Sequence, residues 1–218
     1  MGIIKYFNHI KSRRNVLRGY FKIDKGLSLL DESCVPSYCH KNSILSWVAW
    51  WRLIKADGLL RKFKPEVNVV LDFGAGSGEL FYLINKPVEY DFVESNNILK
   101  YFINTQIPLA KEVKLDEQKR DSYDVILALD SLEHNKEPEG IIIKLVSSLK
   151  PGGLFILSGP TENLIYKIGR RFAGFRGGYH SVTVYELEKT FRKYLINKIT
   201  VSGPLFLPIF RISAWIKK

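Results

Sequence analysis

Hydrophobic residues recur along this chain with two different spacings. From about residue 67 onward, short β-branched runs alternate with segments whose apolar residues recur every three or four positions. The first spacing predicts strands and the second predicts helices. Seven strands are expected, at residues 67–74, 88–95, 111–115, 122–130, 152–160, 197–203 and 210–218. Helices are expected between them, at residues 78–85, 96–106, 137–149 and 184–195.

The order of these elements also predicts how they assemble. Strands that alternate with helices form a parallel sheet with helices on both faces. Between the last two candidate strands lies only a short apolar loop, residues 203–208, so we expect an antiparallel addition to the sheet there. The fold class is therefore α/β, with a seven-stranded, mostly parallel sheet that contains one antiparallel strand.

A further helix is expected upstream of the sheet, at residues 43–60, where Trp47, Trp50, Trp51 and Ile54 occur at helical spacing. One interpretation is a helix that packs on a face of the sheet. The other is a lid, or a wall of an acceptor pocket. The sequence leaves both open.

Composition indicates an ordinary globular protein of 218 residues, with 46% hydrophobic and 25% charged residues. Cys34 and Cys39 suit neither a disulfide framework nor a zinc site, so a reducing cytoplasm is the expected location. The first 24 residues are basic, but they lack the apolar stretch and cleavage site of a signal peptide. We find no repeat and no linker, and we therefore expect a single domain over residues 1–218.

The net charge of +11 lies mainly at the two ends of the chain. Residues 1–30 carry a net +6 and residues 163–218 a net +9, which leaves −4 for the remainder. An anionic partner would therefore meet the terminal segments. The alternative interpretation is a charged surface that only keeps the protein in solution.

The stretch "VLDFGAGSGEL", residues 70–80, places Gly74, Gly76 and Gly78 directly after the first strand of the sheet. Ligands of open α/β sheets bind at this position, and glycines let the backbone approach them closely. A dinucleotide fingerprint would need glycine where this chain has Glu79, whose charge would repel a pyrophosphate. The Walker phosphate-binding pattern is missing as well. The turn therefore suits a nucleoside whose charged end is not a phosphate.

This stretch resembles the first motif of the class I S-adenosylmethionine-dependent methyltransferases. "SYDVILALDSLEH" and "LKPGGLFILSGP" are similar to the fourth- and fifth-strand motifs of the subgroup that acts on small molecules, lipids and quinone precursors. The resemblance covers roughly residues 65–195. It implies a Rossmann-like methyltransferase fold, S-adenosyl-L-methionine as the cofactor, a helical cap at 1–60, a cofactor-binding half at 65–160 and an acceptor-side half at 161–218.

The resemblance also implies which residues bind the cofactor. Glu94 lies twenty positions after Gly74 and matches the family's acid that accepts hydrogen bonds from both ribose hydroxyls. An acid after the third strand often meets the adenine amino group, a role that fits Asp116, with Glu117 as the alternative. The predicted cofactor-binding set is Asp72, Gly74, Gly76, Gly78, Glu94, Asp116 and Asp130.

The candidate catalytic residues are two histidines, His134 and His180. S-adenosylmethionine carries its methyl group on a sulfonium, so transfer requires alignment and, for an oxygen acceptor, a general base. Histidine has a suitable pKa for that base, although a structural histidine at the end of a strand or helix is the competing interpretation. Asp130 and Glu133 lie in one loop and do not make a metal site on their own, so no metal is predicted.

The acceptor is predicted less sharply than the cofactor. The chain lacks the Asn/Asp-Pro-Pro-aromatic motif of enzymes that methylate exocyclic amines of bases. Residues 2–21 and 203–218 interleave apolar with basic residues, which suits an anionic membrane surface, the alternative being an ordinary helix and a core strand. The leading hypothesis is methylation of an oxygen on a small or lipid-linked acceptor by a cytoplasmic, peripherally membrane-bound enzyme. The alternatives are an RNA methyltransferase, supported by the net charge, and a non-catalytic cofactor-binding or scaffold protein.

Overall fold

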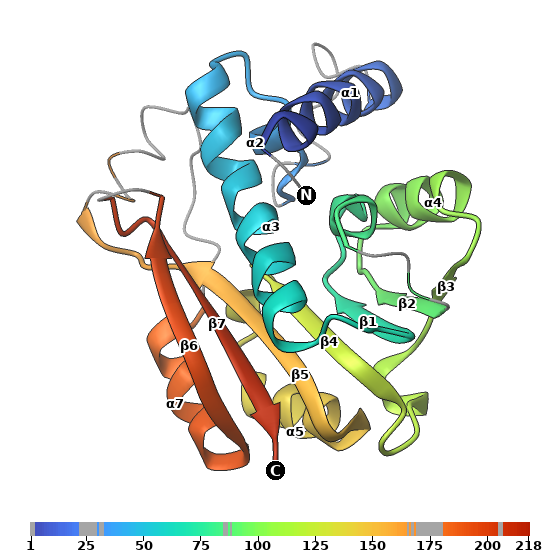
Figure 1. Ribbon diagram of the computed structural model, residues 1–218, viewed down its shortest axis with the longest axis vertical. Coiled ribbons are helices and arrows are strands. Elements are labelled where there is room, and N and C mark those ends of the chain that lie inside the picture. The colour runs from blue at the N-terminus through green and yellow to red at the C-terminus, as the bar shows by residue number, and fades with distance from the viewer. Residues whose placement is uncertain are drawn as a thin grey trace.

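A seven-stranded sheet forms the centre of the computed structural model (Figure 1). The structure describes residues 3–21, 30, 33–84, 87, 89–164, 166, 168, 181–204 and 207–218, with side chains from residue 6 onward. The strand order is β3-β2-β1-β4-β5-β7-β6. The strands are β1 (Val69–Phe73), β2 (Glu89–Val93), β3 (Ala110–Glu112), β4 (Tyr123–Leu129), β5 (Leu149–Pro160), β6 (Leu195–Gly203) and β7 (Phe210–Lys217).

The direction of the strands confirms the predicted fold class. β1, β2, β3, β4 and β5 pair in parallel, whereas β7 is antiparallel to both of its neighbours, β5 and β6. The connection from β6 to β7 has no room for a crossover helix, and this forces the reversal. The result is a Rossmann-like sheet with one antiparallel strand and helices on both faces.

Adjacent residues of the central strands enter two separate cores. Val125 and Leu127 of β4 contact the core on one face, while Ile126 and Ala128 contact the core on the other. Side chains of a strand alternate between its faces, so an unbroken apolar run means that both faces are covered. This is the physical reason why the strands could be located from the sequence.

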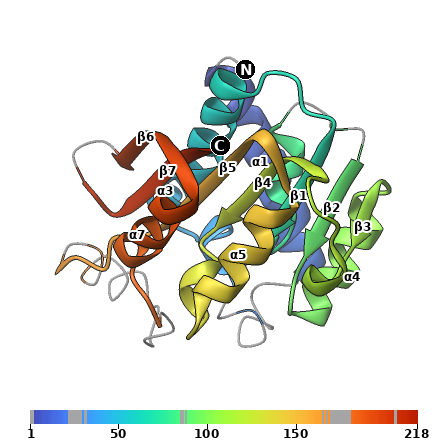
Figure 2. The same ribbon diagram turned by 90° about the horizontal axis from the view of Figure 1, so that it is seen from below.

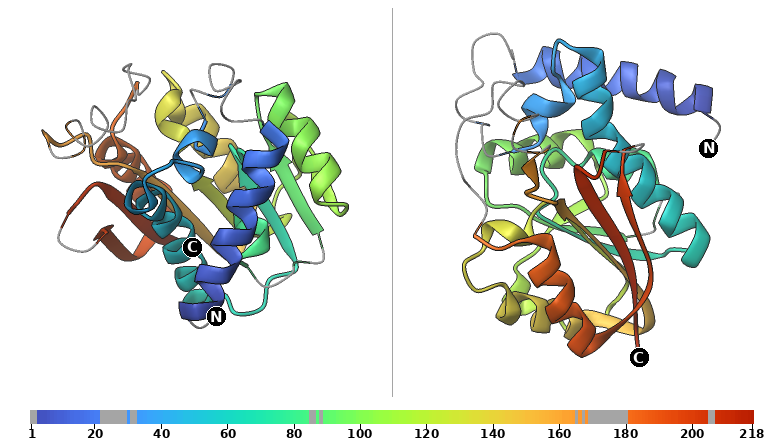
Figure 3. Two further views of the ribbon diagram at one scale, coloured as in Figure 1. Left: turned by 90° about the horizontal axis from the view of Figure 1, so that it is seen from above. Right: turned by 90° about the vertical axis from the view of Figure 1, so that its left-hand side faces the viewer.

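The helices divide between these two faces (Figures 2 and 3). On one side lie the N-terminal helices and α4, and on the other side lie α5 and α7. α1 and α2 lie at the top of the view in Figure 1, by the edge at which the parallel strands end. The α-helices are α1 (Ile3–Phe21), α2 (Val35–Tyr38), α3 (Ser43–Phe63), α4 (Asn97–Gln106), α5 (Pro138–Ser148) and α7 (Val184–Tyr194). Three short 3-10 helices are η2 (Glu79–Tyr82), η3 (Leu115–Glu117) and η4 (Leu132–His134).

The first predicted crossover helix, residues 78–85, is much shorter in the structure. Within residues 78–84, which the structure describes, the helical part is the 3-10 helix η2. Leu80, Leu83 and Ile84 are buried, so a single turn already satisfies the apolar spacing of this segment. A pattern of eight residues specifies which face is buried, but it does not specify the length or the pitch of the helix.

α3 reconciles the two interpretations of the tryptophan-rich segment. Trp50 is fully buried and Trp51 nearly so, in the core between α3 and the sheet. Trp51 packs so closely on Gly203 that a Cβ at that glycine would lie 2.4 Å from the indole ring. Leu53 of the same helix, however, lines a cavity. α3 therefore packs on the sheet and also forms part of a pocket wall.

The two termini behave differently from each other. β7 contains half of residues 203–218, and its Ile212, Ala214 and Trp215 are fully buried in the sheet. Of the two interpretations of this segment, the structure supports a core strand for β7, because its apolar residues pack in the core. α1 packs through one side only and leaves Phe7, Lys11 and Arg18 exposed on the other. In the described part of the chain, no helix is both long enough and apolar enough to cross a bilayer.

Candidate active site

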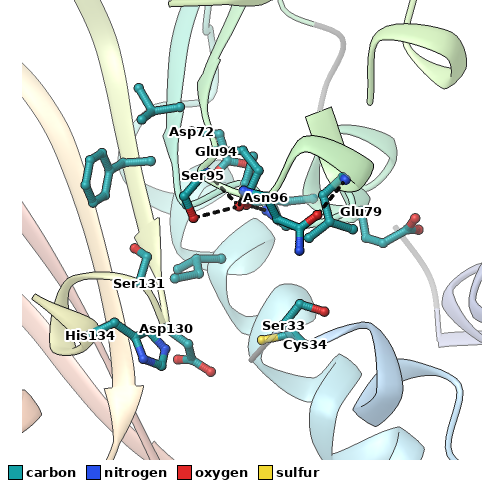
Figure 4. A pocket seen from close by; sticks show the side chains of 18 of the residues that line it. Ser33, Cys34, Asp72, Glu79, Glu94, Ser95, Asn96, Asp130, Ser131 and His134 are labelled. Carbon is teal, nitrogen blue, oxygen red and sulfur yellow. Dashed lines mark hydrogen bonds between the residues drawn. The ribbon is translucent and has the colours of Figure 1, made fainter. Parts of the chain in front are cut away.

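A cavity of about 780 Å³ opens where β1, β2 and β4 end (Figure 4). This size is in the range of pockets that bind cofactors and other small ligands. Its walls come from the turns after these three strands, from the start of α4 and from the segment around α2 and α3. Of the predicted cofactor-binding residues, it is lined by Asp72, Gly74, Gly76, Glu94 and Asp130. His134 also lines it.

The glycine turn after β1 forms one wall of this cavity. Gly74 has a φ of +72° and Gly76 a φ of +59°, which are strained values for any residue with a side chain. A Cβ at Gly74 would lie 2.2 Å from the Cβ of Ser131, so this glycine also permits close packing of two turns. A Cβ at Gly76 would meet no protein atom within 4 Å. Gly78 lies behind the wall, where a Cβ would be 2.8 Å from Ile107 Cδ1.

Glu94 connects the end of β2 to the glycine turn. Its Oε2 accepts a hydrogen bond from the amide of Gly76 at 2.7 Å. Its Oε1 accepts from the amides of Ser95 and Asn96 at 2.8 and 2.9 Å. These three bonds fix the carboxylate at the rim of the cavity, where its remaining acceptor capacity is available to a ligand.

Asp72 lies at the end of β1 and is almost fully buried. The hydroxyl of Tyr90 donates a hydrogen bond of 2.5 Å to its Oδ2. Burial raises the pKa of Asp72 to about 7, and the nearby charge of Glu94 contributes in the same direction, although the hydrogen bond from Tyr90 opposes the rise. A positive charge in the cavity would favour the ionised form of this carboxyl.

Asp130 lines the cavity at the end of β4, but its carboxylate already has partners. It forms a buried ion pair with Arg52 of α3, and it accepts a hydrogen bond of 2.7 Å from the hydroxyl of Ser158. The guanidinium of Arg52 also lies 4.5 Å from the centre of the Phe210 ring. Asp130 is therefore positioned to hold α3 against the pocket.

The structure places Asp116 away from the cavity that most of the other predicted cofactor-binding residues line. Asp116 lies in η3, outside the cavity lining, and its exposed carboxylate pairs with Lys144 of α5. Glu117 is also exposed and pairs with Lys114 at 3.1 Å. β3 is only three residues long, and the 3-10 turn after it directs these acids to the surface near α5. Neither acid is brought to the pocket.

His134 on η4 lines the cavity, and in Figure 4 this histidine lies away from Glu94 and Asn96. The neighbouring Glu133 does not line the cavity. Its carboxylate is buried and has no hydrogen-bond partner in the described part of the chain. Burial raises the pKa of Glu133 to about 7, against the effect of its own backbone amide and of Arg52. The other candidate histidine, His180, lies outside the described residues.

Several lining residues were not predicted from the sequence. The hydroxyl of Ser131 is buried beside Gly74 and has no partner among the described residues. A lone serine after a strand gives no signal by itself, and Tyr38 and Leu53 reach the pocket from helices far away in the sequence. Glu79 was noted only for its charge, yet it also lines the cavity.

Comparison with known proteins decides the family. Residues 47–194 match the sequence profile of a methyltransferase domain family. The chain belongs to this family. The match includes the glycine turn, Glu94 and His134, and it confirms the resemblance to class I S-adenosylmethionine-dependent methyltransferases. No match was found among curated protein sequences.

Solved structures, two of them described as methyltransferases, share the fold. The PH0226 protein of Pyrococcus horikoshii is 17% identical, with a TM-score of 0.66 over 84% of this chain and 96% of its own. The magnesium protoporphyrin IX methyltransferase ChlM from Synechocystis, with bound S-adenosylhomocysteine, is 15% identical, with a TM-score of 0.60 over 81% and 88%. The N-methyltransferase NodS from Bradyrhizobium japonicum, also with S-adenosylhomocysteine, is 14% identical, with a TM-score of 0.57 over 75% and 85%.

The residues of the cavity fit the cofactor of a methyltransferase, S-adenosylmethionine. The turn at Gly76 leaves open space where any side chain would intrude, and the buried hydroxyl of Ser131 lacks a partner that a ligand could supply. Four carboxylates and no lysine or arginine line the cavity in the described part of the chain. Glu79 and Asp130 are paired with Arg13 and Arg52, so Asp72 and Glu94 are the carboxyls of this lining that would suit a sulfonium cation and disfavour a phosphate.

Proposed function

We propose that this methyltransferase transfers a methyl group from S-adenosylmethionine to an oxygen of a small or lipid-linked acceptor. The observation that carries the proposal is a single cavity that combines a fixed ribose-type acceptor, Glu94, with a histidine, His134, on the side away from it. The cofactor supplies an activated methyl group when it is bound. The protein has to bind it, orient the acceptor and remove one proton.

In this proposal, the residues around the glycine turn bind the cofactor, and each has its own role. Glu94 would hold the ribose hydroxyls, since a carboxylate offers acceptor oxygens to two neighbouring donors. Gly74 and Gly76 would allow the backbone to lie against the cofactor. Asp72, whose raised pKa reflects burial without a cation, would counter the positive end of the cofactor, and Ser131 would contribute a hydroxyl.

The proton-transfer part rests on His134, with His180 as the second candidate from the sequence. A base within hydrogen-bond reach of an acceptor hydroxyl speeds transfer by about 10² to 10⁴. His134 lines the cavity beside Ser131 and Asn135, close to the turn after β4. We therefore assign it as the general base.

The acceptor class is inferred from the surface around the ends of β5 and β7. Three exposed side chains, Leu164, Ile168 and Leu207, belong to the segments that follow β5 or precede β7, at the edge of the sheet where the parallel strands end. We call them the apolar rim, and 72%, 47% and 46% of their surface is exposed. The side-chain amide of Asn163 donates a hydrogen bond of 2.8 Å to the carbonyl of Pro208 and so joins the two segments that carry the rim. Exposed leucine and isoleucine near a site favour an apolar acceptor.

The membrane part of the proposal rests on α1 rather than on both termini. α1 contains no acidic residue. Its exposed side carries Lys11, Arg18 and the exposed aromatic ring of Phe7, a combination that suits the headgroup region of an anionic membrane. A cytoplasmic enzyme docked in this way would reach a lipid-carried acceptor by diffusion along the surface.

The experiment is an acceptor screen with isotopically labelled S-adenosylmethionine against three separate pools: lipid extract, water-soluble metabolites and total RNA. We expect label in a lipid or small-molecule fraction, with mass and NMR data that place the methyl on oxygen. The Glu94→Ala variant should transfer none. Label on RNA, or on nitrogen or carbon of the product, would contradict the proposed acceptor while leaving the cofactor assignment in place.

A further inference from the structure

One side chain of α1 reaches the wall of the cofactor cavity. Arg13 is buried, and its Nε and Nη2 donate hydrogen bonds to Oε2 and Oε1 of Glu79, both at 2.8 Å. Glu79 lines the cavity and is only 2% exposed. Both oxygens of this carboxylate are therefore held by one guanidinium, which comes from a residue 66 positions earlier in the chain.

Arg13 makes a second contact with the same structural element. Its guanidinium lies 3.8 Å from the centre of the Tyr82 ring. Glu79 and Tyr82 are the first and last residues of η2, and Gly78 of the glycine turn directly precedes them. The planar guanidinium of Arg13 makes two parallel hydrogen bonds to Glu79 and stacks on Tyr82, so it fixes the orientation of both side chains as well as neutralising the carboxylate. The ammonium group of a lysine cannot reproduce this geometry.

The ion pair also determines the charge next to the cofactor. Burial raises the pKa of Glu79, and the hydrogen bonds and charge of Arg13 act in the opposite direction. Removing one partner of a buried pair leaves an uncompensated charge, and here that charge would lie in the wall of the cavity. The turn that carries Gly74 and Gly76 would then lose the contact that holds its far end.

α1 has another attachment that does not involve the cavity. The hydroxyl of Tyr6 donates a hydrogen bond to Asp57 of α3, and Asp57 also pairs with Arg61. Neither Tyr6 nor Asp57 lines the pocket. Substitutions of Arg13 and of Tyr6 can therefore be compared. Both side chains attach α1 to the rest of the protein, but of the two only Arg13 contacts a residue that lines the cavity.

We propose that Arg13 is a positioning residue of the cofactor site, which holds Glu79 and the glycine turn and so links the docking of α1 to cofactor binding. The proposal rests on the assignment of this cavity to S-adenosylmethionine. α1 lies outside the residues that match the methyltransferase family, 47–194, so this link belongs to the chain's own N-terminal helix. Linkage is reciprocal, and bound cofactor must therefore stabilise docked α1.

The test measures binding of S-adenosylhomocysteine by calorimetry to the full chain and to the variants Arg13→Gln, Arg13→Lys and Tyr6→Phe. We expect Arg13→Gln to weaken binding by about 5- to 150-fold, the usual range for coupled sites. Arg13→Lys should lose less affinity than Arg13→Gln but should not reach that of the wild type, because lysine keeps the positive charge without the two parallel hydrogen bonds of a guanidinium. Tyr6→Phe should lower the thermal midpoint but change the dissociation constant by less than about twofold, since it touches only the attachment to α3.

Hydrogen exchange of the α1 amides gives a second readout. If Arg13 only stabilised the fold, its substitution would not abolish the effect of the ligand on this exchange. S-adenosylhomocysteine should slow exchange of the α1 amides in the wild type and in Tyr6→Phe, but not in Arg13→Gln. If Arg13→Gln does not fold, Arg13→Lys is read by the same two measurements. Unchanged affinity in folded Arg13 variants, with the wild type binding normally, would overturn the role of Arg13 alone. Failure of the wild type to bind would overturn the cofactor assignment and this proposal together.

Discussion

The carboxylate of Glu94 accepts a hydrogen bond from the amide of Gly76 at 2.7 Å, which joins the end of β2 to the glycine turn after β1. Gly76 has a φ of +59°, and this bond is one of the contacts that hold the turn in that conformation. The ligand-facing backbone is therefore held by contacts that the protein itself supplies. Preorganisation of this kind reduces the free energy that binding would otherwise spend on ordering the loop.

The contact between Gly74 and Ser131 predicts the effect of the smallest possible substitution. Gly74→Ala places a Cβ 2.2 Å from Ser131 Cβ at a residue whose φ is +72°. We expect a loss of about 1 to 3 kcal/mol in the free energy of unfolding, together with weaker binding of S-adenosylhomocysteine. Denaturant unfolding and calorimetry measure the two effects.

Gly140 offers a matched control for this substitution. It lies in α5, and a Cβ there meets no atom within 4 Å. Gly140→Ala should raise stability by about 0.5 to 1 kcal/mol, because alanine loses less backbone entropy in a helix. Equal effects of the two substitutions would show that the approach of Ser131 to Gly74 is not a tight contact in solution.

Glu133 predicts a pH dependence of stability. Its pKa is raised by burial from 4.5 to about 7, so the folded protein is destabilised relative to the unfolded chain as pH rises from about 4.5 to 7. Glu133→Gln should remove this penalty, which is about 3 kcal/mol above pH 7 and absent below about pH 4.5. Urea unfolding of both proteins across this range measures the difference. A difference that does not vary with pH would contradict the buried, uncompensated state of this carboxyl.

If His134 is the general base, its substitution should slow methyl transfer without weakening cofactor binding. His134→Ala should lower kcat by about 10² to 10⁴ with the acceptor found by the screen, while the affinity for S-adenosylhomocysteine stays within about twofold. A parallel loss of affinity and thermal stability would instead show that His134 is a structural residue.

The position of Asp116 outside the cavity predicts that its substitution does not affect cofactor binding. Its carboxylate is exposed and pairs with Lys144, outside the cavity. Asp116→Ala should therefore leave the affinity for S-adenosylhomocysteine unchanged, and it should cost at most about 1 kcal/mol of stability, as for other surface ion pairs. A loss of affinity as large as that of a Glu94 variant would return Asp116 to the cofactor site.

The parts of the structure that could be predicted from the sequence are those set by local patterns. β1 and β4 each contain an unbroken apolar run, residues 69–71 and 125–129, because both faces of the sheet are covered, and the alternate glycines mark a turn whose positive φ angles favour glycine. The resemblance to the methyltransferase motifs pointed to Glu94 and His134, and both line the cavity. The single turn of η2 was not predicted, because one buried face is compatible with helices of several lengths.

The contacts that sequence reasoning missed are long-range. Arg13 and Glu79 are 66 positions apart, and no spacing rule connects them. The direction of Asp116 depends on a three-residue strand followed by a 3-10 turn, which hydrophobic patterns do not specify. The C-terminal segment has the composition of a membrane-surface segment, and only the pairing of β7 between β5 and β6 shows that its apolar residues belong to the core.

The most direct test of the central claim is a set of thermal midpoints with S-adenosylmethionine, S-adenosylhomocysteine, NAD and ATP, for the wild type and for Glu94→Ala. A ligand that binds only the folded protein stabilises it by about 2.7 kcal/mol at a hundredfold excess over its Kd. We predict a rise with the first two ligands alone, and none of that rise in Glu94→Ala. No rise in the wild type, or a rise with NAD or ATP instead, would contradict the assignment of this cavity to S-adenosylmethionine.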